Sequence, residues 1–245
     1  MTLRSYLIAL LLAPLAAATC AQAPKDVTDG EVALLPPFCP ETTSFRYGDQ
    51  TGRKQAPYWV SLMGKNFWLM HHYCWAKINQ RRILNSVMNP TARSNQLGGV
   101  IADLNFVAQN SMPDFVMLPE IYSSLGEVEL LRKNPVLASV HFEKARKFNP
   151  GYAPPHYFWS EYLISIGKKD EAKAHLKMGL EHNKSAADLQ TLYRKLGGDP
   201  AAVVALRPSA DRLEVPAQNP FDAASAASAA KAPDGAGSSP QAAIQ

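Results

Sequence analysis

Residues 119–152 read PEIYSSLGEVELLRKNPVLASVHFEKARKFNPGY, and they contain the first copy of a repeated pattern of small and apolar residues. When the sequence is displaced by about 34 positions, apolar or small residues of this stretch fall on apolar or small residues of the next. The matching pairs are Leu130 with Ile164, Ala138 with Ala172, Phe142 with Leu176, and Ala145 with Gly179. A period of this length is typical of a helix-turn-helix unit. The sequence therefore predicts successive helical hairpins in residues 119–152 and 153–186.

The small side chains at the repeated positions have a physical purpose. Alanine and glycine let two helices approach closely, while Phe142 and Leu176 fill the groove between them. Gly167, followed by two lysines and an aspartate, is typical of a helix end and the turn before the next helix. Because strand signals are scarce throughout the chain, we predict an all-α fold without a sheet.

The same residues resemble the tetratricopeptide repeat family. The family's signature positions in residues 119–152 are held by Tyr122, Leu125, Gly126, Ala138, Phe142, Ala145 and Pro150. A further position, usually aromatic, holds Glu129 instead. Residues 153–186 are a weaker copy that carries Trp159, Gly167, Ala172, Leu176 and Gly179, with Lys184 in place of the terminal proline. The resemblance implies antiparallel helical hairpins stacked as a short solenoid.

The segments on either side of these repeats also have helical periodicity. Residues 58–118 are predicted to form a divergent hairpin longer than the standard unit, with a short and a long helix in 58–87 and another helix in 93–110. Residues 186–196 carry Leu189, Leu192, Tyr193 and Leu196 at helical spacing. Since helical arrays need a polar terminal element for solubility, we interpret this segment as a capping helix that completes a repeat region over 119–200.

The two ends of the chain have a different composition. Residues 1–23 contain Arg4, an apolar run and then small residues, which is the pattern of a secretory signal peptide, so we expect an exported, periplasmic protein. A lipid anchor at Cys20 is the alternative, but the residues before it match the lipoprotein pattern poorly. Residues 24–57 are predicted to be an irregular leader. Residues 201–245 are rich in Ala, Ser and Pro and are predicted to be a disordered tail.

Cys39 and Cys74 would remain after removal of the signal. In an oxidising compartment an even pair of cysteines is most simply a disulfide, which would tie the leader to the first long helix. One alternative is a pair of free thiols. The other is a zinc or copper site, because His71 lies one helical turn from Cys74 and would add a nitrogen ligand to the two sulfur ligands. No haem attachment motif is present in the sequence.

Neither an enzyme nor a nucleic-acid-binding protein is indicated by the sequence. Motifs for a serine nucleophile, a zinc protease or a phosphate-binding loop are lacking, so no catalytic residue or cofactor is predicted. The formal net charge is +4, and basic residues alternate with acidic ones along the predicted helices without forming a basic patch. No apolar stretch after residue 23 is long enough to span a membrane.

The resemblance also implies a binding surface, because repeat proteins bind partners with the concave face lined by the first helix of each hairpin. The family's groove positions correspond to Glu120, Ser123, Glu127, Leu130, Tyr157, Glu161 and Ile164. This groove is acidic and includes an aromatic side chain, which suits a basic or amine-bearing peptide. The family's clamp for a terminal carboxylate requires a cation and amides where this chain has Glu120, Ser123 and Glu127. The glutamates can also be read simply as a solvated helix face.

The function predicted from the sequence is therefore that of a periplasmic scaffold or adaptor that holds a protein or peptide partner. The alternative is a metal- or redox-handling periplasmic protein centred on Cys39, His71 and Cys74.

Overall fold

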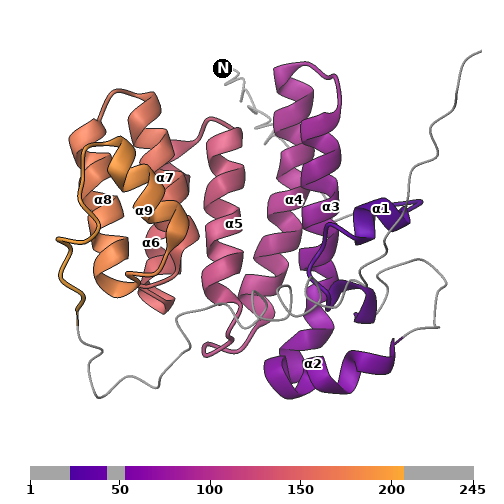
Figure 1. The fold of residues 1–245 in the computed structure, drawn as a ribbon. Helices are drawn as coiled ribbons and strands as arrows, with labels where there is room; N and C mark the ends of the chain where they lie inside the picture. Colours follow the sequence, from indigo (N-terminus) through magenta and orange to yellow (C-terminus); the bar gives the residue numbers. More distant parts are fainter. Residues whose placement is uncertain (1–22, 43–52, 207–245) are drawn as a thin grey trace, which may run out of the picture.

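A computed structural model describes residues 23–42 and 53–206, and every regular element in these residues is helical (Figure 1). The predicted signal peptide, except for Ala23, lies outside the described residues, as do residues 43–52 of the leader and residues 207–245 of the predicted tail. The prediction of an all-α fold is confirmed for the described residues. None of their helices is both long and apolar enough to cross a membrane.

Helices long enough to form hairpins begin at Met70. They are α3 (Met70–Asn85), α4 (Pro90–Asn110), α5 (Leu118–Leu131), α6 (Pro135–Phe148), α7 (Ala153–Ser165), α8 (Lys169–His182) and α9 (Ala187–Lys195). The bounds of α4 and α9 lie within three residues of the helices expected at 93–110 and 186–196.

Local chemistry explains several of these boundaries. The side chain of Asn89 accepts a hydrogen bond of 2.8 Å from the backbone N–H of Ala92, which caps the start of α4. Proline occupies the first turn of α4, α5, α6 and α7, where its missing N–H would have no partner within the helix. Gly167 has a positive φ of 82°, a conformation that glycine adopts without steric cost, and it turns the chain between α7 and α8.

The helices pack mainly against their neighbours in the chain. The closest packing is between α3 and α4, between α5 and α6, and between α7 and α8. Contacts between α4 and α5, α6 and α7, and α8 and α9 join these pairs, and α5 also touches α7. Figure 1 accordingly shows α3 and α4 at one end of the row, α5 in the middle and α7 to α9 at the other end.

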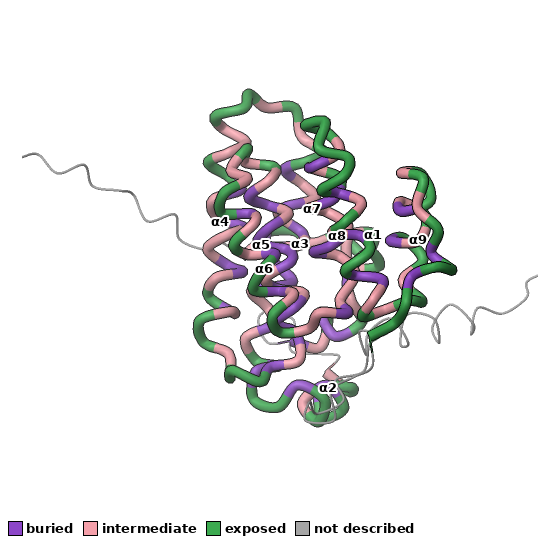
Figure 2. The backbone as a smooth tube through the Cα atoms, turned by 90° about the vertical axis from the view of Figure 1, so that its left-hand side faces the viewer, coloured by how far each residue is buried: buried purple, intermediate pink, exposed green. Residues whose placement is uncertain are grey.

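The core runs between these helices. Figure 2 shows buried residues concentrated in the interior of the helix row, while the connecting turns are largely exposed. Ala138, Phe142, Ala145, Ala172 and Leu176 are fully buried, as expected from their repeated positions. A cluster formed by Leu176, Leu180, Leu189, Tyr193 and Val203 attaches α9 to α8.

The described parts of the leader contain more regular structure than the sequence suggested. It contains α1 (Asp29–Val32), η1 (Cys39–Glu41) and η2 (Arg53–Gln55), and it continues into α2 (Ala56–Met63) and η3 (Gly64–Leu69). Thr28 and Glu31 form a reciprocal capping box at the start of α1. Phe38 and Cys39 are fully buried and belong to the same core cluster as Trp59 and Tyr73. The leader therefore adds its own side chains to the core beside α3.

Candidate functional site: a groove along α3, α5 and α7

Glu120 is the central polar residue of the surface formed by the first helices. Its carboxylate accepts hydrogen bonds from the hydroxyls of Tyr73 on α3 (2.7 Å), Ser124 on α5 (3.1 Å) and Tyr152 at the start of α7. The ammonium group of Lys77 on α3 lies 3.3 Å from the same carboxylate. Glu120 on α5 thus contacts residues of α3 and of the start of α7, and these residues lie 47 and 32 positions from it in the sequence.

The electrostatics of Glu120 follow from these neighbours. Burial raises the pKa of Glu120, but the Lys77 charge and the hydrogen bonds from Tyr152, Tyr73 and Ser124 together hold it below its ordinary value. Burial and the charge of Glu120 raise the pKa of Tyr73 well above its ordinary value. Glu120 is therefore an ionised acceptor that already has internal donors, and its contacts hold α3 and the start of α7 against α5.

The other predicted groove residues of α5 lie in different environments. Ser123 is 1% exposed, so a partner at the surface cannot reach it, and the prediction that it contacts a partner is wrong. The sequence pattern placed Ser123 on the first-helix face but could not show how closely the neighbouring helices cover it. Glu127 and Leu130 are half-buried and remain accessible.

The α7 part of the predicted groove consists of Tyr157, Glu161 and Ile164. Glu161 is exposed, and the other two side chains are half-buried. The Tyr157 hydroxyl donates a hydrogen bond of 2.8 Å to the Glu161 carboxylate, and this bond raises the pKa of Tyr157. The pair therefore presents an aromatic ring and a carboxylate in a defined arrangement.

A pocket of about 350 Å³ opens between α3, α5 and the leader. Its lining consists of Leu34, Leu35, Pro36, Tyr73, Lys77, Gln80, Arg81, Leu84, Asn85 and Glu127. Only Glu127 of these residues belongs to the groove predicted from the sequence. The leader thus covers part of α3 and forms one wall of the pocket.

Two pocket residues of opposite charge lack a charged partner. The guanidinium of Arg81 donates one hydrogen bond, 3.2 Å long, from Nη2 to the carbonyl oxygen of Leu34. Its Nη1 is buried and has no hydrogen-bond partner among the described residues. Glu127, from α5, forms neither an ion pair nor a hydrogen bond within the part of the chain that the structure describes.

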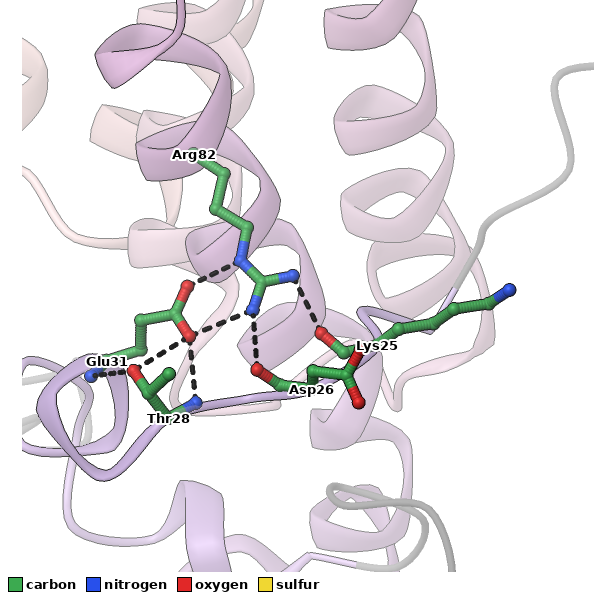
Figure 3. Close-up of polar contacts among 5 residues, drawn as sticks. All are labelled: Lys25, Asp26, Thr28, Glu31 and Arg82. Atoms are coloured by element: carbon green, nitrogen blue, oxygen red, sulfur yellow. Dashed lines mark hydrogen bonds and ion pairs between the residues drawn. The ribbon is translucent and has the colours of Figure 1, made fainter.

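The leader is fastened to α3 at several points. Arg82 donates hydrogen bonds from Nη2 to Glu31 Oε2 (2.9 Å) and from Nη1 to the carbonyl oxygen of Lys25 (2.9 Å), and Figure 3 shows its guanidinium between these groups. The hydrogen bond from Arg82 is the main reason why the pKa of Glu31 falls to about 2. Further along, a disulfide joins Cys39 to Cys74, with a Cα–Cα distance of 5.7 Å. Since leader residues 31 and 39 meet α3 residues 82 and 74, the leader runs antiparallel to α3.

The three residues of the alternative metal site, which are Cys39, His71 and Cys74, make other interactions in this structure. Both cysteine sulfurs are bonded to each other, so neither is a thiolate ligand. His71 Nδ1 lies 2.8 Å from the carbonyl oxygen of Trp68, and its ring packs 4.8 Å from that of Trp75. Within residues 23–42 and 53–206, no three His, Cys, Asp or Glu side chains are grouped so as to hold a metal ion.

A histidine–carboxylate pair lies between α3 and α4. Nδ1 of His72 is 2.7 Å from Oδ1 of Asp103, which is fully buried. Burial raises the pKa of Asp103, although its hydrogen bond to His72 acts in the opposite direction. The His72 ring also packs against Phe106, at 4.2 Å between ring centres. The pair fixes the orientation of His72 and links the helices of the first long hairpin.

Comparisons of the chain with family models, with curated proteins and with solved structures find no match in any of the three.

Sequence reasoning missed the contribution of α3 to the pocket. The lining residues that α3 supplies are Tyr73, Lys77, Gln80, Arg81, Leu84 and Asn85, and the 34-residue period could not be extended to them because the α3–α4 hairpin is longer than the later ones. The spacing of Tyr73, Lys77 and Arg81, each four residues after the last, was the available signal, since such residues share one helix face.

Proposed function

We propose that this chain is an exported scaffold of the tetratricopeptide type, which holds a protein or peptide partner against the surface formed by α3, α5 and α7. The observation that carries the proposal is the contact between α5 and α7 in addition to the contacts within each hairpin. Such contacts between the first helices of successive hairpins are what a repeat solenoid requires, because its concave face is built from those helices.

The chemistry of this surface supports a partner segment with basic groups. Glu127 and Glu161 offer carboxylates, and Tyr157 offers an aromatic ring next to Glu161. Lysine or arginine side chains of a partner would gain electrostatic attraction from the carboxylates and stacking on the ring. Leu130 and Ile164 provide half-buried apolar contacts. We therefore propose Glu127, Leu130, Tyr157, Glu161 and Ile164 as the contact residues.

Affinity capture from the native envelope after crosslinking tests the proposal. We expect the Glu127→Lys and Glu161→Lys variants to lose at least one partner that the wild-type protein captures, because each change places a cation opposite basic groups. The matched control is Glu143→Lys, which makes the same charge reversal at an exposed position of α6, a second helix. Retention of the whole partner set by both groove variants would refute the groove proposal.

A further inference from the structure

The pocket between the leader and α3 brings together Glu127, which is a contact residue of the proposed scaffold, and Arg81, which that proposal does not use. Arg81 lines it from α3, and Glu127 lines it from α5, yet the two side chains do not form an ion pair with each other. Nη1 of Arg81 is buried without a hydrogen-bond partner among the described residues. The guanidinium makes one hydrogen bond, to the carbonyl oxygen of Leu34, and has no carboxylate partner among the described residues, so a ligand carboxylate would supply the counter-charge.

The part of the pocket lined by Glu127 suits a cation. The Glu127 carboxylate is half-buried and has no donor among the described residues. An ammonium group supplies three donors and a positive charge, which fits this environment. Lys77, the other cation of the lining, is already held by Glu120 at 3.3 Å and by the hydroxyl of Ser124 at 2.9 Å. The remaining charges in the pocket are therefore one guanidinium and one carboxylate.

The rest of the lining defines the body of the ligand. Gln80 is 6% exposed and makes no hydrogen bond within the described part of the chain, so its amide can pair with a peptide group. Leu34 from the leader and Leu84 from α3 are exposed apolar side chains in the lining. A volume of about 350 Å³ is within the range of small-molecule sites.

From this geometry we infer that the pocket binds a small zwitterion with an apolar side chain, of the size of a dipeptide. Its carboxylate pairs with Arg81, its ammonium group with Glu127, and its apolar side chain covers Leu34 and Leu84. A dipeptide fits better than a single amino acid, because it carries a peptide group that can pair with the Gln80 amide in the pocket lining. This inference concerns a small ligand and goes beyond the proposed scaffold role.

Titration calorimetry on the full mature chain tests the inference with L-leucyl-L-leucine, its N-acetyl derivative, its C-terminal amide and free leucine. We expect saturable binding of the dipeptide, with affinity at least tenfold weaker after either end is blocked. Arg81→Gln should weaken dipeptide binding at least tenfold and leave the affinity for the amide unchanged. Glu127→Gln should also weaken dipeptide binding at least tenfold and should leave the affinity for the N-acetyl derivative unchanged. The control variant Lys147→Gln, at an exposed site on α6, should bind like the wild type.

The outcomes separate this inference from the groove proposal. Lack of saturable dipeptide binding at millimolar concentration, or equal losses for the dipeptide and its amide in Arg81→Gln, would overturn the inference. Stronger binding of free leucine than of the dipeptide would also overturn it. If Arg81→Gln loosens the leader by removing the bond to Leu34, Glu127→Gln decides the question, because Glu127 makes no described hydrogen bond to the leader. Partner capture that depends on Glu161, which does not line the pocket, would stand in either case.

Discussion

Gly126 on α5 lies directly against the ring of Phe142 on α6: a Cβ added at Gly126 would be 2.5 Å from the nearest ring carbon. Phe142 is fully buried, so the ring has no open space into which it could move. Their contact shows why position 126 must be small where position 142 is large.

Gly126→Ala should therefore destabilise the protein. Overpacking a tight core costs about 1–3 kcal/mol, which exceeds the gain of up to about 1 kcal/mol from replacing glycine by alanine within a helix. Urea unfolding followed by circular dichroism measures the change. Gly99→Ala on α4 is the matched control, since its Cβ would meet nothing within 4 Å and the variant should gain about 0.5–1 kcal/mol. Equal changes in the free energy of unfolding of the two variants would contradict the close contact between Gly126 and Phe142.

The disulfide between Cys39 and Cys74 should make a large contribution to stability. The cysteines are 35 residues apart, and closing a loop of this size stabilises a fold by about 3–4 kcal/mol on the chain-entropy model. We expect the urea midpoint to fall on reduction, and the double variant Cys39→Ala/Cys74→Ala to unfold like the reduced wild type. A reduced protein that unfolds at the same urea concentration as the oxidised one would show that the leader is held by its other contacts.

Stability should depend on pH through His156. Its ring is almost completely buried, and burial lowers its pKa from 6.5 to about 4. The unfolded state therefore binds more protons between these values, so stability is complete above about pH 6.5 and declines as the pH falls toward 4. Urea midpoints measured across this range should fall less steeply for His156→Gln than for the wild type. The comparison isolates His156 from His71, His141 and His175, whose pKa values burial also lowers. If the urea midpoint falls with pH equally steeply in both proteins, the prediction of a neutral, buried His156 is wrong.

The contact between Glu31 and Arg82 should protect the leader down to low pH. Because the pKa of Glu31 is lowered from 4.5 to about 2, its contribution is complete above about pH 4.5 and is lost as the pH falls through 2. Glu31→Gln should increase the rate of proteolytic cleavage within residues 25–35 at neutral pH. Asp114→Asn, at an exposed loop position away from the leader, is the control. A carboxyl pKa of Glu31 near 4.5 by NMR titration would contradict the prediction.

The helices could be predicted because their positions depend on residues close together in the sequence. The cysteine pair could be predicted because only two cysteines follow the predicted signal peptide. Helix ends near Asn89 and Gly167 follow from capping and turn preferences of single residues. The spacing of Ala138, Phe142 and Ala145 follows from one helix face, and the structure buries all three residues. A residue's own neighbours in the chain are sufficient for predictions of this kind.

The groove was less predictable because its chemistry depends on segments far apart in the chain. Glu120 was expected to face a partner, but the structure surrounds it with Tyr73 and Lys77 from α3 and with Tyr152. Ser123 was expected at the surface and is buried. Residues that share a helix face in the sequence can differ in exposure, because the neighbouring helices cover parts of that face unequally.

The positions of the helices, the sites that must be small or large, and the cysteines available to pair can all be predicted from local sequence patterns. The antiparallel course of the leader along α3, and the presence of Arg81 and Glu127 in one pocket, become evident only in the folded chain. The physical reason is distance along the chain: periodicity records which face of a helix is apolar, whereas contacts such as that of Glu31 with Arg82, 51 residues apart, exist only after the helices have packed.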